Sequence, residues 1–237
     1  MTTTITIPGY AHGYPGVAFG GYVAGLLAER TSGSSVRVDF RRAVPVDTPV
    51  LLAETASGCS LLDTDGNLLA EAGPDTDAAL SIPPPPTLAE AKAASATSAT
   101  ADRAVADCYG CGTTNTPGRG LRLHPWGLRA RNQVIAAWIP DPELAAPTGT
   151  LTSPNVWSAL DCPGGWVAIL ASGMRPGGLT AAMRVTVHQP VSAGEEHLVH
   201  AWPISVDGRK YTVGVAVSTA DGMPCATAEA LWIEPRG

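Results

Sequence analysis

Two stretches of the chain alternate apolar and polar residues with a period of two, which is the pattern of a half-buried β-strand. One begins VRVDF, in residues 36–49, and the other begins MRVTV, in residues 183–196. They align without gaps, so that Val38 matches Val185, and each continues into residues typical of a turn. We therefore predict a strand and a turn at corresponding places in two halves of the chain.

A second pair of matching stretches lies further along each half. LLDTDGNLLAEA (61–72) aligns with VSTADGMPCATAEA (217–230) at a shared Asp-Gly. Asp-Gly between apolar runs is a strong signal for a hairpin turn. The second half has another Asp-Gly in ISVDGRKYTV (204–213), which we interpret as an extra hairpin that explains the larger offset of this second match.

A helix is predicted before each set of strands. The candidates are GGYVAGLLAER (20–30) and SPNVWSALD (153–161), and the apolar run WVAILAS could extend the second. Pro163 lacks an N–H, so it should kink or end this helix just beyond Asp161. One helix followed by three or four antiparallel strands, twice over, predicts an α+β fold with two tandem repeats, each a long curved antiparallel sheet wrapped around a central helix. The alternative to an internal duplication is chance similarity between two β-rich segments.

A low-complexity segment separates the halves. It reads PPPPTLAEAKAASATSATADRA, and nearly all of its apolar residues after the prolines are alanine. This composition is typical of a linker, although AEAKAA could form a short helix. We expect an N-terminal repeat at 1–82, a linker at 83–106 and a C-terminal repeat at 107–237.

Composition and charge exclude several classes of partner. The 237 residues carry a net charge of −6 and no long Lys/Arg cluster, so neither nucleic acid nor a membrane surface is an expected partner. No apolar run approaches the roughly 20 residues of a membrane span, and the first residues do not resemble a signal peptide, so we expect a cytoplasmic protein. The five cysteines are scattered and odd in number, which favours free thiols. Cys108 and Cys111 form a lone CxxC without a second ligand pair, so no metal site is expected.

Asp161 is the residue that calls for a chemical explanation. It lies within LTSPNVWSALDCPGGWVAIL, and aspartate is rarely buried in an apolar helix without a partner. It could satisfy backbone N–H groups at a turn, or it could be a working acid. On a helix, Asp161 shares a face with several small residues, and the first helix has a similar stripe, so the two helices could pack closely around a common site. The small residues are Gly164, Gly165 and Ala168 beside Asp161, and Gly21, Ala24 or Gly25, and Ala28 in the first helix.

Together these motifs resemble the hotdog-fold acyl-CoA thioesterases, in a duplicated, double-hotdog form. The resemblance is carried by GGYVAGLLAE (20–29), RRAVPVDTPV (41–50), CYGCGTTNTPGRGLRL (108–123) and SPNVWSALDCPGG (153–165).

The resemblance implies a catalytic pair shared between the halves. In single-hotdog members a His-Gly-Gly signature opens the central helix, and a carboxylate follows nine residues after the histidine. The first half of this chain has Phe19 before Gly20 and Gly21, with Ala28 nine residues on. The second half has Thr152 at the first position and keeps the carboxylate as Asp161. The implied pair is therefore Gly20 or Gly21, as backbone N–H donors to the thioester carbonyl, with Asp161.

The chemistry that follows is thioester hydrolysis. Backbone N–H groups at a helix start can form an oxyanion hole, and a carboxylate can act as general base or nucleophile. We expect an acyl-CoA substrate in preference to an acyl-carrier-protein thioester, with no cofactor beyond the coenzyme A of the substrate. The alternatives are a non-catalytic acyl-thioester binding protein and a hotdog hydratase or dehydratase. Either a monomer or a homodimer is compatible with a duplicated chain.

Candidate substrate contacts are His12, Tyr14, Tyr22, Thr152, Trp157, Gly164 and Gly165; candidates for the coenzyme A phosphates are Arg37, Arg41, Arg42, Arg175 and Arg184.

Overall fold

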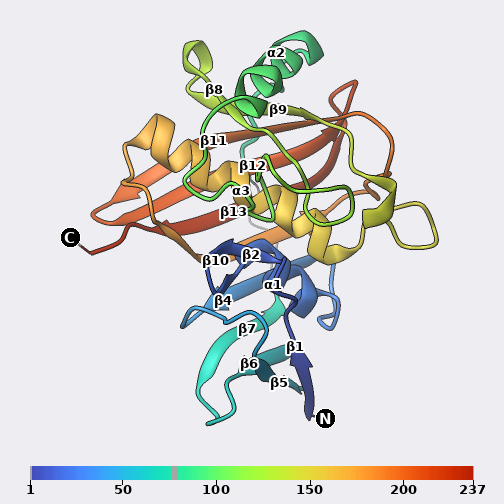
Figure 1. Ribbon diagram of the computed structural model, residues 1–237, viewed down its shortest axis with the longest axis vertical. Helices are drawn as coiled ribbons and strands as arrows, with labels where there is room; N and C mark the ends of the chain where they lie inside the picture. The colour runs from blue at the N-terminus through green and yellow to red at the C-terminus, as the bar shows by residue number, and fades with distance from the viewer. Residues whose placement is uncertain (1, 76–79, 237) are drawn as a thin grey trace.

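The computed structural model describes residues 2–75 and 80–236 and is built on one 11-stranded antiparallel sheet, against which the helices pack (Figure 1). The first half contains β1 (Thr2–Thr6), β2 (His12–Tyr14), β3 (Val17–Ala18), α1 (Gly20–Ala28), β4 (Ser35–Phe40), β5 (Pro49–Glu54), β6 (Cys59–Leu62) and β7 (Leu68–Pro74). The second half contains α2 (Leu88–Ala99), β8 (Trp126–Leu128), β9 (Gln133–Trp138), α3 (Ser153–Ser172), β10 (Leu179–Val187), β11 (His197–Asp207), β12 (Lys210–Thr219) and β13 (Pro224–Ile233), with short 3₁₀ turns at Arg129–Arg131 and Pro142–Leu144.

Apart from β8 at one edge, the strand order is mirrored about the β4–β10 pair. It runs β1-β5-β6-β7-β4-β10-β13-β12-β11-β9-β8. The central pair is β4 with β10, in a register that places Val38 opposite Met183 and Val36 opposite Val185. These are the two strands with period-two patterns, so both predicted strands are confirmed.

The Asp-Gly turns lie where the sequence predicts hairpins, with one difference. Gly66 and Gly222 have φ angles of +84° and +92° in the turns that join β6 to β7 and β12 to β13. The turn at Asp207-Gly208 joins β11 to β12. In the first half the same connection is made by the shorter pair β5 and β6. The prediction of an extra hairpin is therefore wrong, because the offset comes from longer arms on a hairpin that both halves have.

Helix α3 does not end at Pro163. It continues unbroken for 20 residues and stops at Gly173, whose φ of +77° is typical of a helix C-terminus. Pro163 removes one N–H from the interior of the helix, at a typical cost of about 3 kcal/mol. The helix lies against the inner strands of the sheet and most of its residues are buried, so packing offsets that cost.

Helices α1 and α3 lie side by side in direct backbone contact (Figure 1). A Cβ on Gly21 would lie 2.6 Å from Ser158 Cα, and one on Gly25 would lie 2.5 Å from Pro154 Cα. Real Cβ atoms do not approach other atoms this closely. The predicted close approach is confirmed for the small residues of α1, but on α3 the contact is made by the backbone of Pro154 and Ser158, because Gly164 and Gly165 face Trp232 of the sheet. The contact brings the start of α1 to the middle of α3.

The Pro/Ala-rich segment contains a packed helix. Thr87 and Glu90 form a capping box at the start of α2. The Ser95 hydroxyl exchanges hydrogen bonds with the backbone N–H and C=O of Ala137, on the part of β9 that β8 does not pair. The segment therefore covers a strand edge that would otherwise be exposed.

None of the helices in the described ranges combines the length and hydropathy of a membrane span.

Candidate active site

The carboxylate of Asp161 lies where α1, α3 and β10 meet. Its Oδ2 accepts a hydrogen bond of 2.7 Å from the Gly21 backbone N–H, and its Oδ1 accepts one of 2.7 Å from the Thr180 hydroxyl. Asp161 is only 1% exposed. Two donors from separate elements therefore fix the orientation of a buried acid.

Burial changes the acidity of this group. It raises the pKa of Asp161 to about 6, against the opposing effect of the hydrogen bonds from Thr180 and Gly21. A carboxyl with a pKa near 6 is largely ionised at pH 7 and still basic enough to accept a proton. Such a shift in the wall of a cavity is typical of catalytic acids and bases.

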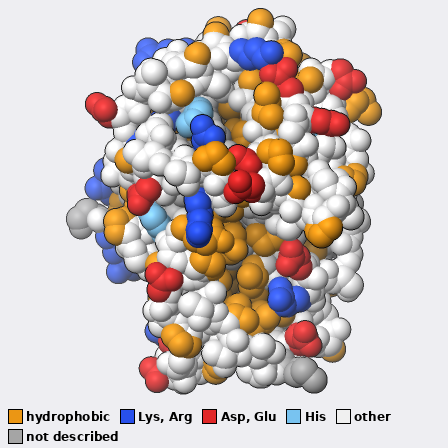
Figure 2. All heavy atoms as spheres, turned by 45° about the vertical axis from the view of Figure 1, so that its right-hand side comes forward, with side chains coloured by type: hydrophobic (Ala, Val, Ile, Leu, Met, Phe, Trp, Pro, Cys, Tyr) orange, Lys and Arg blue, Asp and Glu red, His pale blue; other side chains and the backbone are white. Residues whose placement is uncertain are grey.

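Asp161 lies in the wall of a cavity of about 670 Å³. This volume falls within the range of about 300–1,000 Å³ that is usual for small-molecule sites. On the face shown in Figure 2, hydrophobic side chains gather in a band along the middle of the molecule, bordered by basic and acidic side chains. The cavity lining is largely apolar and includes Val17, Phe40, Val44, Val105, Trp166, Ile169, Met174, Leu179 and Trp232.

Three of the predicted catalytic and substrate-contact residues besides Asp161 line this cavity: Gly20, Tyr14 and Gly165. The Tyr14 hydroxyl donates to the Gly178 carbonyl at 3.2 Å. A Cβ on Gly165 would lie 2.8 Å from the Trp232 indole, so the glycine lets that ring close one side of the cavity.

Gly20 and Gly21 occupy different positions relative to the acid. Gly21 donates its N–H to Asp161 and does not line the cavity. Gly20 lines the cavity, and a Cβ on it would lie 3.0 Å from Asp161 Oδ2. Of the two predicted oxyanion donors, Gly20 is therefore the one that faces the space where a substrate would bind.

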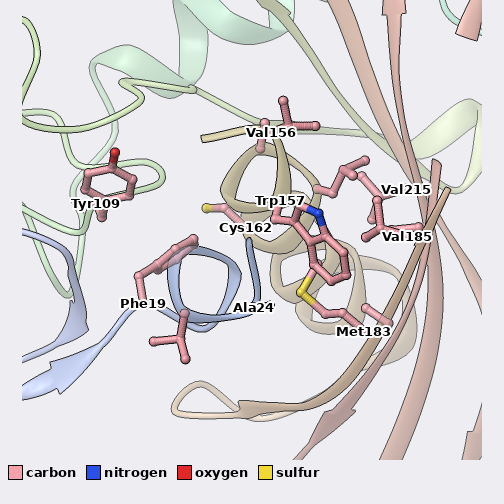
Figure 3. Close-up of a cluster of buried hydrophobic side chains, with 14 of the residues drawn as sticks. Phe19, Ala24, Tyr109, Val156, Trp157, Cys162, Met183, Val185 and Val215 are labelled. Atoms are coloured by element: carbon pink, nitrogen blue, oxygen red, sulfur yellow. The ribbon is translucent and has the colours of Figure 1, made fainter. Parts of the chain in front are cut away.

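Trp157, Gly164 and Thr152 do not line the cavity. Trp157 is 2% exposed and packs between α3 and the sheet with Met183 and Val215 (Figure 3). Gly164 also faces the sheet, where a Cβ would lie 3.0 Å from Trp232 Nε1. The Thr152 hydroxyl accepts from Asn155 at the start of α3. The structure therefore does not bring these three residues to the cavity: Trp157 and Gly164 pack against the sheet, and Thr152 lies at the N-terminus of α3.

His12 and Tyr22 also lie outside the cavity. The β2–β3 pairing shifts register between His12 and Tyr14, and the two side chains have different surroundings. His12 Nε2 lies 3.2 Å from an Asp107 carboxylate oxygen, in a smaller hollow. Tyr22 packs edge-on against Tyr109 at 5.2 Å between ring centroids. Neither residue is therefore positioned to contact a group bound in this cavity, whereas Tyr14 lines it.

Sequence reasoning missed Thr180, which orients Asp161, and Glu29, a carboxylate at the start of α3 that does not line the cavity. Thr180 is the second residue of β10, and nothing local in the sequence connects it to Asp161. Glu29 follows Ala28, the first-half counterpart of Asp161, and its carboxylate accepts from the Ser153 backbone N–H at the start of α3. Burial raises the pKa of Glu29, opposed by Arg30 and by this hydrogen bond. The sequence signal that could have identified Glu29 is its place directly after Ala28.

Most of the arginines proposed to meet coenzyme A are engaged elsewhere. Arg37 pairs with Asp39, Arg41 with Glu71, Arg175 with Glu234, and Arg184 with Asp75 and Glu229. Arg41 and Arg42 nonetheless line the cavity, together with Arg209 and Arg103. Across the described residues, no group of three or more His, Cys, Asp or Glu side chains is arranged to hold a metal ion.

Comparison with models of known protein families finds no match, and neither does comparison with curated proteins. Comparison with solved structures does. A TesB protein of Mycobacterium avium subspecies paratuberculosis superposes with a TM-score of 0.65 at 15% identity, covering 99% of this chain and 93% of that one. A Novosphingobium aromaticivorans protein described as a thioesterase gives 0.64 at 16% identity, covering 99% and 96%. A hot dog fold protein of unknown function from Alicyclobacillus acidocaldarius gives 0.62 at 12% identity, covering 100% and 94%. Since these identities are low, the likeness establishes the fold, and the chain has a hotdog fold over nearly its whole length.

Proposed function

We propose that this protein hydrolyses acyl-CoA thioesters, with Asp161 as general base or nucleophile. The observation that carries the proposal is the buried Asp161 carboxylate, held by Gly21 N–H and Thr180 Oγ1 in the wall of a largely apolar cavity. The thioesterase descriptions of proteins with the same fold are consistent with it.

Each part of the reaction has a candidate group. Thioester hydrolysis needs attack on the carbonyl carbon, stabilisation of the oxyanion and departure of the thiolate. Asp161 would deprotonate the attacking water, or attack directly to form an anhydride that water then cleaves. The Gly20 N–H, at the positive end of α1, would donate to the oxyanion. Gly21 N–H and Thr180 would keep the carboxylate oriented during the reaction.

The cavity lining favours an apolar acyl group. Side chains such as Ile169, Met174 and Trp166 would surround the chain, while the exposed Arg41 and Arg42 would lie near the coenzyme A phosphates. An acyl-carrier-protein thioester presents the same phosphopantetheine arm and is the second choice.

We also infer that the fold is a double hotdog. The mirrored strand order, with β4 and β10 at its centre, supports two repeats. The packing of α1 on α3 supports a site shared between them. The proposed boundaries are 1–82, 83–106 and 107–237, with the linker holding α2. Such a chain would contain within itself the pair of hotdogs that single-repeat members assemble from two subunits, and sedimentation analysis would distinguish a monomer from a homodimer.

The alternatives predict different outcomes. A hydratase or dehydratase needs an acid and a histidine together, and no histidine lines the cavity in the described part of the chain. A non-catalytic binding protein would use Asp161 only to join α1 to α3. Hydrolysis of acyl-CoAs of graded chain length, followed with a thiol reagent, tests the proposal. Thermal stabilisation by acyl-CoA without turnover would favour the binding protein.

A further inference from the structure

Three thiols meet in the wall of the cavity, beside Asp161. Cys108 and Cys111 lie in the loop between α2 and β8, and Cys162 follows Asp161 on α3. All three line the cavity and are only 6–8% exposed. A Cβ on Gly110 would lie 2.8 Å from Cys162 Cβ, so the loop lies directly against the helix. Cys162 points away from the sheet, toward the side where Tyr109 lies (Figure 3).

The loop has a defined shape that keeps Cys108 and Cys111 together. The Gly112 N–H donates to the Cys108 carbonyl at 2.7 Å, which closes a single turn around the CxxC. The Tyr109 N–H donates to the His12 carbonyl, and the Leu123 N–H donates to the Gly110 carbonyl. These bonds fix the loop on both sides of the thiols.

Cys111 is the thiol whose surroundings favour the thiolate. Hydrogen bonds from Cys108, Cys162 and Trp166, with the nearby Arg103 guanidinium, hold the pKa of Cys111 well below its usual value. The hydrogen bond that Cys108 gives to Cys111 raises the pKa of Cys108 to about 12. Of the three thiols, Cys111 is therefore the one whose surroundings most favour ionisation.

Arg103 supplies an independent indication of negative charge at this place. Its guanidinium lies 4.5 Å from the centre of the Trp166 ring, and Nη2 donates to the Ser98 carbonyl and hydroxyl. Its Nε and Nη1 are buried and have no hydrogen-bond partner among the described residues. Two buried N–H groups without a partner favour an anion close by, and Cys111, which lines the same cavity and whose pKa Arg103 lowers, is a group that can supply one.

We propose that Cys111 and Cys108 form a peroxide-reactive dithiol in the cavity wall. The Cys111 thiolate attacks the peroxide, an S–O bond forms and the O–O bond breaks, so that sulfur is oxidised to a sulfenic acid and the peroxide is reduced to hydroxide or alkoxide. The Cys108 thiol then attacks that sulfur, an S–S bond forms, and the hydroxyl leaves with the thiol proton as water. The balance is one dithiol and one peroxide giving one disulfide and two molecules of water, or one of water and one of alcohol when the peroxide is an alkyl hydroperoxide.

Oxidation would change the environment of the cavity. The disulfide removes the thiolate and leaves Arg103 without its counter-charge. The change lies close to Asp161, because the neighbouring residue Cys162 packs against the loop that carries the disulfide. The modification site does not depend on which reaction the cavity performs, because it needs only access for a small peroxide.

The test treats the full-length protein with one equivalent of hydrogen peroxide, then counts thiols after denaturation and maps disulfides by peptide mass. Two of the five thiols should be lost, with a mass lower by two hydrogen atoms and a Cys108–Cys111 bridge that a dithiol reductant reverses. Cys108→Ser should lose one thiol and react with a cyclic 1,3-dione that traps sulfenic acid. Cys59→Ser, a buried cysteine outside the cluster, should leave the bridge unchanged.

Arg103→Gln tests the charge without touching a thiol, and should slow the peroxide reaction about tenfold or more. The proposal is overturned if Cys111→Ser, shown to be folded by circular dichroism, loses thiols as fast as the wild type. It is also overturned if the mapped bridge or the lost thiols in the wild type involve Cys59, Cys162 or Cys225, or if Arg103→Gln reacts at the wild-type rate.

Discussion

The Gly21 N–H and the Asp161 carboxylate are 140 positions apart in the sequence and 2.7 Å apart in the fold. The contact exists because α1 and α3 touch through their backbones at Gly21 and Gly25. The position of the acid is therefore set by the packing of two helices, one from each half of the chain.

Gly21→Ala should weaken the fold. A Cβ at this position would lie 2.6 Å from Ser158 Cα and 2.7 Å from the Trp157 carbonyl oxygen, so the helices would have to separate. Overpacking of this kind typically lowers the free energy of unfolding by about 1–3 kcal/mol. Urea denaturation measures the change, with Gly73→Ala as the control because no atom lies within 4 Å of its Cβ position. Equal stability of the two variants would show that α1 and α3 are not held this closely.

The pH dependence of hydrolysis should follow Asp161. The carboxylate form is the active one, so kcat/KM should rise as pH increases through about 6 and then level off. Thr180→Val removes a hydrogen bond that lowers the pKa of Asp161, and a bond to a charged group is worth about 1.5–3 kcal/mol. The rising limb should move to higher pH by about one to two units, whereas Thr180→Ser should restore it. If the rising limb of the pH profile stays in place in Thr180→Val, the group that titrates is not Asp161.

Asp161→Asn should not destabilise the protein at neutral pH. The pKa of Asp161 is raised from 3.8 to about 6, so the folded state keeps a proton between these values that the unfolded chain has lost. Stability of the wild type therefore falls as pH rises from about 4 to 6, by at most about 3 kcal/mol. Asparagine does not titrate, and Thr180 can rotate to accept from its amide. Denaturation at pH 8 should give a variant at least as stable as the wild type, with the advantage shrinking toward pH 4. A pH-independent difference would contradict the shifted pKa.

His200 should contribute to loss of stability in acid. Burial lowers the pKa of His200 to about 4, while the unfolded side chain titrates near 6.5. Its contribution is complete above pH 6.5 and declines as pH falls toward 4, because the unfolded chain takes up a proton that the folded one excludes. His200→Phe keeps the ring stacked on Trp202 and removes the titration. Unfolding curves between pH 7 and 4 should show a shallower decline for the variant; parallel declines would refute the assignment.

The strands and their turns could be predicted because their signals are local. Period-two alternation identified β4 and β10, and Asp-Gly identified the β6–β7 and β12–β13 turns. Helix α2 was harder, since its apolar residues are nearly all alanine and it is held by Ser95 and Ser98, which bond to distant backbone groups. No local pattern encodes such contacts.

The candidate site could be predicted only in part, because several of its contacts join residues that are distant in the sequence. Asp161 stood out as an acid in an apolar helix, and the small residues of α1 indicated what would pack beside it. Trp157 shares a helix face with Asp161, but the ring turns to the sheet while the carboxylate meets α1, a distinction that spacing along a helix does not make (Figure 3). Thr180 reaches the acid only through the arrangement of α3 on β10.

The central claim is tested most directly by acyl-CoA hydrolysis in Asp161→Asn and Glu29→Gln, measured side by side with the wild type. Each variant changes one carboxylate: Asp161, on α3, accepts from an N–H at the start of α1, and Glu29, just after α1, accepts from an N–H at the start of α3. Of the two, only Asp161 lines the cavity. We predict that Asp161→Asn lowers kcat/KM by about 100-fold or more, as expected for loss of a general base or nucleophile, while Glu29→Gln stays within a few-fold of the wild type. Full activity in folded Asp161→Asn would contradict the account.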